Sequence, residues 1–183
     1  AAPAVPAAPL APPAPPSAPE EAAREIPVSL TSEESCYIHA PVSDVWERIK
    51  DLGSMDWWNL VAESRCLAPP PGGVGASYLL RFKDGATKTV RLLELSYIAR
   101  TLVFEVTAAE PALGATGIVH ALRLRPVTAG GGTFLTWTTR FSSDASAAVV
   151  QDAKFKKLEA FGGLAGAFPS HAACATALGA AGL

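Results

Sequence analysis

Two side chains in the middle of the chain, His120 and Tyr78, are the best suited to proton chemistry. A histidine titrates near neutral pH, so one that faces an apolar cavity can act as a general acid or base. More often such a histidine bonds a neighbouring hydroxyl group, and both interpretations stay open for His120. The Tyr78 hydroxyl can hold a ligand carbonyl or phenol, or lie at a rim with its oxygen in water. His120 and Tyr78 are therefore the candidate catalytic residues.

The sequence predicts no metal site and no cofactor. The three cysteines, Cys36, Cys66 and Cys174, are an odd number and form no CxxC pair, so neither a disulfide framework nor a structural zinc site is indicated. A buried thiol is the simplest interpretation of Cys36 and Cys66, and one disulfide among the three stays open. His171 and Cys174 have the spacing of metal ligands, but we attribute it to chance. There is no glycine-rich phosphate loop, serine triad or carboxylate pair.

Charge and hydropathy exclude two classes of partner. The net charge is −2 over 183 residues, and Lys and Arg are scattered, so we expect no nucleic-acid binding. No apolar stretch is long enough to span a membrane, which predicts a soluble protein. The compartment stays open: it is cytoplasmic, or an organelle or exported compartment reached with a targeting peptide that is later lost.

Composition divides the chain into three parts. Residues 1–31 are rich in Ala and Pro and predict a disordered arm, with docking to a protein partner as the alternative. Residues 32–168 carry the periodic pattern of a folded domain. Residues 169–183 form an Ala/Gly-rich tail.

Within the domain, strand-like and helix-like segments follow a simple order. Alternating residues between turn signals predict strands at 35–39, 63–67, 76–82, 88–96, 102–107, 119–126 and 133–141. Helical spacing predicts short helices at 43–51 and 55–60 and a long helix at 145–168. Short loops favour an antiparallel meander, and a curved sheet must bury its concave face against the long helix. We therefore expect an α+β fold in which sheet and helix enclose a cavity.

Several segments resemble one superfamily in type and order. The segment IHAPVSDVWERIKDLGSMDWWNLV is similar to the opening of polyketide cyclase/dehydrase-type START-like (SRPBCC) proteins. GVGASYLLRF, DGATKTVRLLELS, TLVFEV and GGTFLTWTTRF then match in order. The resemblance implies a helix-grip fold: a curved seven-stranded antiparallel sheet with two short helices and one long C-terminal helix. Tyr78 and Val90 stand where the lachrymatory-factor synthase group carries its catalytic Arg and Glu, so that activity does not transfer.

The resemblance also implies which residues face the cavity. Alternate strand residues and one helix face would line it: Tyr78, Leu80, Val90, Leu92, Phe104, Val106, Ile118, His120, Leu122, Leu135, Trp137, Thr139, Phe141, Phe155, Leu158 and Phe161. The same residues would also suit a filled core. The near-absence of charge in this set argues against a ligand with a deeply held carboxylate, and Lys154, Lys156 and Lys157 are interpreted as a solvated helix edge.

The sequence leaves three functions open. The first is binding or carriage of a small hydrophobic ligand, such as a lipid, a polyketide or an isoprenoid-like compound. The second is a polyketide cyclase/dehydratase-like enzyme in which His120 and Tyr78 handle protons on a carbonyl substrate. The third is a structural adaptor subunit whose arm and tail contact partners. The sequence leaves open whether the protein is an enzyme.

Overall fold

The computed structural model describes residues 30–68 and 70–168, which form seven strands and two helices. In chain order these are β1 (Thr31–Ile38), α1 (Val42–Ile49), β2 (Val61–Ala68), β3 (Ser77–Phe82), β4 (Thr87–Ser96), β5 (Thr101–Glu110), β6 (Ile118–Val127), β7 (Gly132–Phe141) and α2 (Ala147–Gly166). Each predicted strand overlaps an observed one. The predicted arm at 1–31 and tail at 169–183 lie almost wholly outside the described residues.

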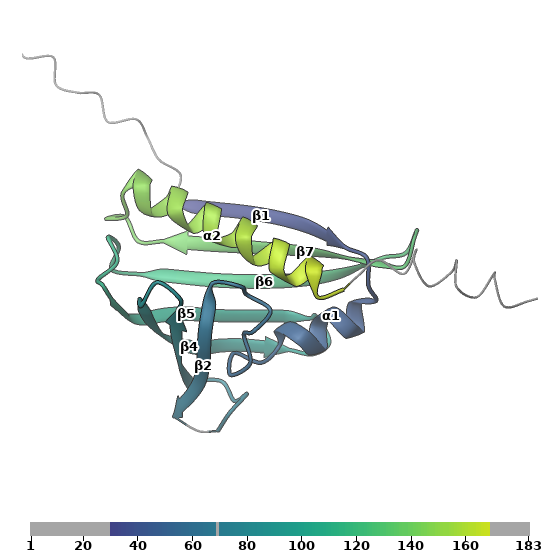
Figure 1. Cartoon of the computed structure of the whole chain (residues 1–183), viewed down its shortest axis with the longest axis horizontal. Helices are drawn as coiled ribbons and strands as arrows, with labels where there is room; N and C mark the ends of the chain where they lie inside the picture. Colours follow the sequence, from purple (N-terminus) through teal and green to yellow (C-terminus); the bar gives the residue numbers. More distant parts are fainter. Residues whose placement is uncertain (1–29, 69, 169–183) are drawn as a thin grey trace, which may run out of the picture.

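The strands form one antiparallel sheet in the order β1-β7-β6-β5-β4-β3-β2. Strands β2 to β7 pair with their neighbours in sequence, while β1 pairs with the last strand, β7. Figure 1 shows α2 running along the β1 and β7 side of the curved sheet, with α1 near one end. The expected α+β helix-grip architecture is confirmed, with one short helix rather than two.

Residues 55–60 form turns rather than the second short helix that the sequence analysis expected. Backbone hydrogen bonds join Trp58 N to the Met55 carbonyl and Val61 N to the Trp58 carbonyl, so two tight turns follow each other. Met55, Trp57 and Trp58 are all buried.

The strands bury alternate residues because the pleat points successive side chains to opposite faces of the sheet. Of the strand residues expected to face inward, all but Val106 are buried, and Val106 is half-buried. Four tryptophans, Trp46, Trp57, Trp58 and Trp137, join the same core. Most of the interior is therefore filled with side chains, as the filled-core alternative predicts.

Helix α2 packs on the sheet through Ala160, Phe161 and Leu164, which are buried. The expectation that Phe155 and Leu158 also close the interior is wrong, since these side chains are 57% and 45% exposed. Because residues advance by about 100° around the axis, Phe155 lies opposite Leu164, and Leu158 lies about 120° away from it, at the edge of the buried face. A Cβ at Gly163 would lie 2.6 Å from the Trp57 carbonyl oxygen, so this glycine permits close contact with the 55–60 turns.

Candidate ligand pocket

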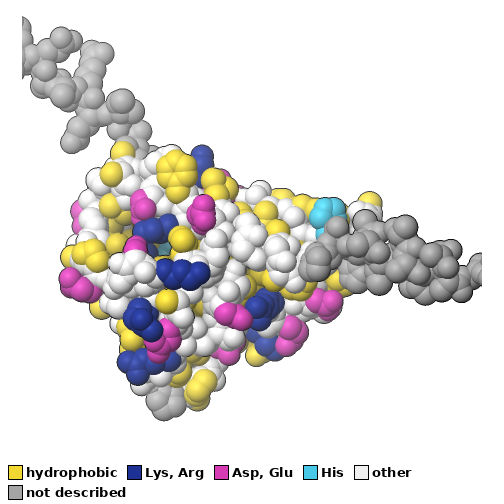
Figure 2. Space-filling model, in the orientation of Figure 1, with side chains coloured by type: hydrophobic (Ala, Val, Ile, Leu, Met, Phe, Trp, Pro, Cys, Tyr) yellow, Lys and Arg dark blue, Asp and Glu magenta, His cyan; other side chains and the backbone are white. Residues whose placement is uncertain are grey.

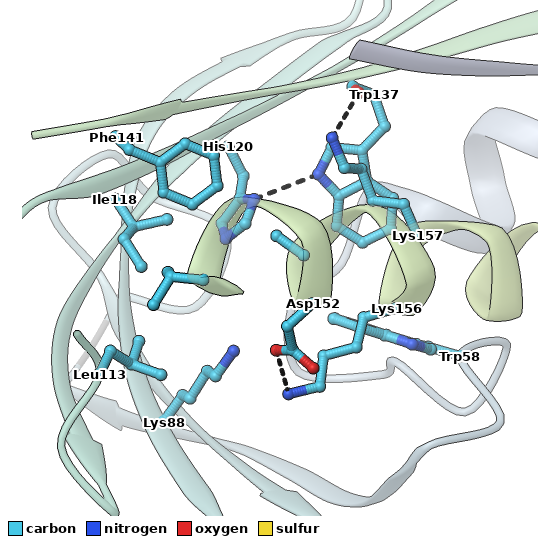
Figure 3. Close-up of a pocket in the computed structure, with 12 residues that line it drawn as sticks. Trp58, Lys88, Leu113, Ile118, His120, Trp137, Phe141, Asp152, Lys156 and Lys157 are labelled. Carbon is cyan, nitrogen blue, oxygen red and sulfur yellow. Dashed lines mark hydrogen bonds and ion pairs between the residues drawn. The ribbon is translucent and has the colours of Figure 1, made fainter. Parts of the chain in front are cut away.

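A pocket lies where the N-terminal half of α2 meets β4, β6 and β7. Figure 3 shows its labelled residues pointing toward a common space. It is lined by Trp58, Lys88, Leu113, Ile118, His120, Trp137, Phe141, Val149, Asp152, Ala153, Lys156 and Lys157. The enclosed volume is about 30 Å³, which is room for about two water molecules.

Leu113, on the connection between β5 and β6, separates this pocket from two neighbouring hollows. A hollow of about 480 Å³ is lined by residues 84–88, 109–111, Leu113 and Lys156. A second hollow of about 180 Å³ lies against Val106, Leu113 and Ile118. Leu113 is half-buried and lines all three spaces. Lys88 and Lys156 also line both the pocket and the larger hollow, and Ile118 also lines both the pocket and the smaller one.

The structure brings four of the expected lining residues to this pocket: Ile118, His120, Trp137 and Phe141. Val106 lines only the adjacent hollow. Thr139 and Phe161 contact pocket residues, Thr139 through the His120 ring and Phe161 through Trp137 at 6.3 Å between ring centroids. The remaining expected strand residues lie in the filled core, namely Tyr78, Leu80, Val90, Leu92, Phe104, Leu122 and Leu135.

His120 lies in β6 and is held by two neighbours on β7. The Trp137 Nε1–H donates to His120 Nδ1 at 3.3 Å, and Thr139 Oγ1 lies 3.0 Å from the same nitrogen. An indole nitrogen only donates, so Nδ1 is the acceptor and the neutral ring carries its proton on Nε2. Burial lowers the pKa of His120 to about 3, with smaller contributions from Lys88 and Lys157.

This environment favours hydrogen bonding over acid–base catalysis for His120. A ring whose pKa lies near 3 is neutral throughout the physiological range, whereas an effective general acid or base has a pKa near the working pH. The contact with Thr139 instead fits the other interpretation of His120, in which the ring bonds a neighbouring hydroxyl group. The free Nε2–H group remains available as a hydrogen-bond donor.

Tyr78 lies away from the pocket, so the structure does not bring it to a common site with His120. Its hydroxyl accepts a hydrogen bond of 2.6 Å from Gly72 N, in the turn between β2 and β3. The ring is 1% exposed, and burial raises the pKa of the hydroxyl. The hypothesis that His120 and Tyr78 act on one substrate is therefore not favoured.

Lys157 is buried, so the interpretation of the helix lysines as one solvated edge is wrong for this residue. Its side chain is 1% exposed, and Nζ donates to the Ser32 carbonyl at 2.8 Å, the Ser32 hydroxyl at 2.9 Å and the Trp137 carbonyl at 3.4 Å. These three acceptors match the three hydrogens of an ammonium group. Burial lowers the pKa of Lys157 to about 8.

Lys88 brings a second lysine to the pocket, and the sequence analysis missed it. In β4 it lies two residues before Val90 and pairs with Leu80 of β3, so its side chain points to the concave face. Its nitrogen lies 5.2 Å from the Phe82 ring centroid. Burial, with a smaller contribution from Lys156, lowers the pKa of Lys88 to about 8. The alternation that placed Val90 and Leu92 on the inner face also places Lys88 there, so the sequence contained the signal for it.

The cysteines and possible metal ligands form no site in the described part of the chain. Cys36 and Cys66 are free thiols, and burial raises the pKa of Cys36 to about 11. A thiol with this pKa is protonated and unreactive at neutral pH. Residues 30–68 and 70–168 contain no group of three or more His, Cys, Asp or Glu side chains placed to hold a metal. His171 and Cys174 lie outside the described residues.

Membrane insertion through a helix has no support in the described residues. Neither α1 nor α2 combines the length and apolar character needed to cross a bilayer.

Several solved structures share this fold. A protein from Nitrosospira multiformis is 26% identical, with a TM-score of 0.69 over 78% of this chain and 98% of that one. The protein XoxI from Bacillus cereus is 18% identical, with a TM-score of 0.65 over 75% and 94%. Ara h 8.0201 is 16% identical, with a TM-score of 0.63 over 75% and 96%. A comparison with curated protein sequences found no match.

The fold and its neighbours define a START/Bet v1-like helix-grip protein. The sequence model of the family described as polyketide cyclase/dehydrase and lipid transport matches residues 29–165. The chain belongs to this family. The resemblance found in the sequence is thereby confirmed.

Proposed function

We propose that the protein binds or carries a small hydrophobic molecule at the α2 end of its sheet. The pocket walls there are mainly apolar, with Ile118, Phe141 and Val149 among them. Small-molecule sites commonly combine such walls with a few polar groups. The family description, which includes lipid transport, agrees with this class of ligand.

The position of Leu113 is the observation that carries the proposal. The pocket of about 30 Å³ is by itself too small for a ligand, since ligand pockets usually measure about 300–1,000 Å³. The adjoining hollow alone measures about 480 Å³, and Leu113 is a wall of both. Binding would displace Leu113 outward, so that the ligand occupies both the hollow and the space beside Ile118.

Native mass spectrometry of freshly purified protein, followed by organic extraction, tests the proposal. We expect a bound compound of a few hundred daltons, or uptake of one from a panel of lipids, polyketides and isoprenoids. A protein that carries nothing and takes up nothing from the panel would contradict ligand binding and favour the adaptor function.

Two adjacent residues provide a matched test of the location. Ile118→Trp fills the pocket, whereas Val119→Trp adds the same ring on the outer face, beside Glu94 and Arg140. We expect Ile118→Trp to abolish uptake and Val119→Trp to preserve it, with thermal unfolding confirming that both variants fold. Val149→Trp, from the helix side of the pocket, serves as a second filling variant. Equal uptake by the filling variants and Val119→Trp would place the ligand elsewhere.

A further inference from the structure

Lys88 makes no direct ion pair within the described residues, although Asp84 and Asp152 lie near enough to act on its charge. None of the hydrogen bonds and ion pairs among residues 30–68 and 70–168 includes its nitrogen, and its one recorded contact is the Phe82 ring. Figure 3 shows the Lys88 nitrogen directed into the pocket. Lys88 is half-buried, and an ammonium group partly withdrawn from water with no counterion in direct contact costs free energy that a ligand of opposite charge would recover.

The other charges at the pocket are already paired. Asp152 and Lys156, one turn apart on α2, form an ion pair of 2.7 Å. The Lys157 ammonium is turned toward Ser32 and Trp137 and has its full set of acceptors. Figure 2 shows basic side chains, in dark blue, interspersed with acidic ones, in magenta, on the face that carries α2. Among the charged groups lining the pocket, Lys88 is thus the one whose charge is unmatched.

His120 adds a neutral donor on the same side. Because Nδ1 accepts from Trp137, the Nε2–H group is free, and no hydrogen bond to it is recorded within the described part of the chain. In Figure 3 the second ring nitrogen of His120 points into the space that Lys88 enters. The pocket therefore offers one cationic donor and one neutral donor against walls formed by Ile118 and Leu113.

We propose that the ligand carries a carboxylate, which Lys88 and the Nε2–H of His120 bind while its apolar body lies against Ile118, Leu113 and Phe141. The two donors match the two oxygens of a carboxylate, whereas a phosphate dianion presents three oxygens and requires more donors. A neutral ligand would leave the charge of Lys88 uncompensated. This inference rests on the proposed function and reverses the expectation that no carboxylate is held in the interior.

Matched pairs of an acid and an alcohol test the inference: decanoate with 1-decanol, and 2-naphthoate with 2-naphthalenemethanol. Affinities for the whole chain are measured by calorimetry at pH 7. We expect the acid of a pair to bind about 10–100-fold more tightly, the usual contribution of a hydrogen bond to a charged group. Lys88→Met should remove this preference and leave the affinity for the alcohol within about three-fold of wild type.

The control is Lys154→Met, which removes an exposed lysine of α2 that does not line the pocket. This variant should keep the preference for acids. His120→Phe should reduce the preference by a smaller factor, about 3–10-fold, as expected for one neutral hydrogen bond.

Two results would overturn the inference while leaving the proposed function intact: equal binding of acid and alcohol, or equal weakening of both by Lys88→Met. Failure of every acid and alcohol to bind the wild-type chain would instead contradict the proposed function and the inference together.

Discussion

The ammonium group of Lys157 lies 2.8 Å from the carbonyl oxygen of Ser32 and joins α2 to β1, across 125 positions of sequence. The same nitrogen bonds the Ser32 hydroxyl and the Trp137 carbonyl, so it also reaches β7. A buried charge with a full set of hydrogen bonds holds the helix at one position over the sheet. Held there, the N-terminal half of α2 forms one side of the candidate ligand pocket.

Replacing Lys157 by Met should destabilise the protein by about 1–3 kcal/mol, because the buried oxygens of Ser32 and Trp137 lose their donor. Urea denaturation measures the change. The matched control is Lys154→Met, an exposed residue on the same helix, whose effect should stay within about 0.5 kcal/mol. Equal effects of the two substitutions would show that the buried contacts do not stabilise the fold.

Two adjacent glycines of α2 should respond in opposite directions to alanine. Gly163→Ala should destabilise the protein by about 1–3 kcal/mol, because the new methyl group would lie 2.6 Å from the Trp57 carbonyl oxygen. A methyl group added at Gly162 would meet no atom beyond its own helix within 4 Å. Gly162→Ala should therefore stabilise the protein by about 0.5–1 kcal/mol through helix propensity. Thermal unfolding of both variants measures the contrast. A gain in stability for both would mean that α2 does not contact the 55–60 turns closely.

The sequence predicted the sheet because its alternation is local. Val90 and Leu92, or Trp137 and Thr139, are two residues apart, and the pleat alone then puts each pair on one face. The 55–60 segment was missed because Trp57 and Trp58 are buried by tertiary contacts with Trp137, which no local pattern reveals.

The site was harder to predict, for three different reasons. Lys88 follows the same alternation as Val90, so its inward direction was predictable, but its charge argued for solvent. Lys157 sits among exposed lysines and is buried only because its nitrogen reaches Ser32, far away in sequence. Leu113 belongs to a connection without periodicity, so only the folded chain shows that it separates the hollows.

The pKa of Lys88 makes stability depend on pH in the alkaline range. Its pKa falls from 10.5 in the unfolded chain to about 8 in the folded one. Between these values the unfolded state binds more protons, so the free energy of unfolding should rise with pH from about 8 to 10.5. Asp84, Asp152 and Lys156 lie around this lysine, and the His120 ring is a further neighbour in the pocket.

Lys157, whose pKa is also about 8, contributes in the same window, so the comparison of wild type with Lys88→Met is needed to show the contribution of Lys88. Denaturation at a series of pH values should show wild type gaining stability relative to Lys88→Met as the pH rises through the window. A constant difference between the two proteins would mean that Lys88 has its ordinary pKa and is solvated.

His120 should remain neutral far below its usual pKa. Burial lowers the pKa from 6.5 to about 3, so between these values only the unfolded state binds the proton, and stability should fall as the pH falls through that range. Nitrogen NMR of the imidazole ring should show the proton on Nε2 at pH 7 and no titration before the protein unfolds. A ring that titrates near pH 6.5 would contradict its burial and reopen the case for acid–base catalysis.

Methyl NMR tests the central claim most directly, because it locates a hydrophobic ligand without assuming its identity. Decanoate is added to protein labelled at the isoleucine, leucine and valine methyl groups. We predict that the largest shifts occur at Ile118, Leu113 and Val149, with Val103 and Val119 on the outer face unchanged. Shifts confined to the outer face, or no shifts with any member of the ligand panel, would contradict a ligand site between α2 and the sheet.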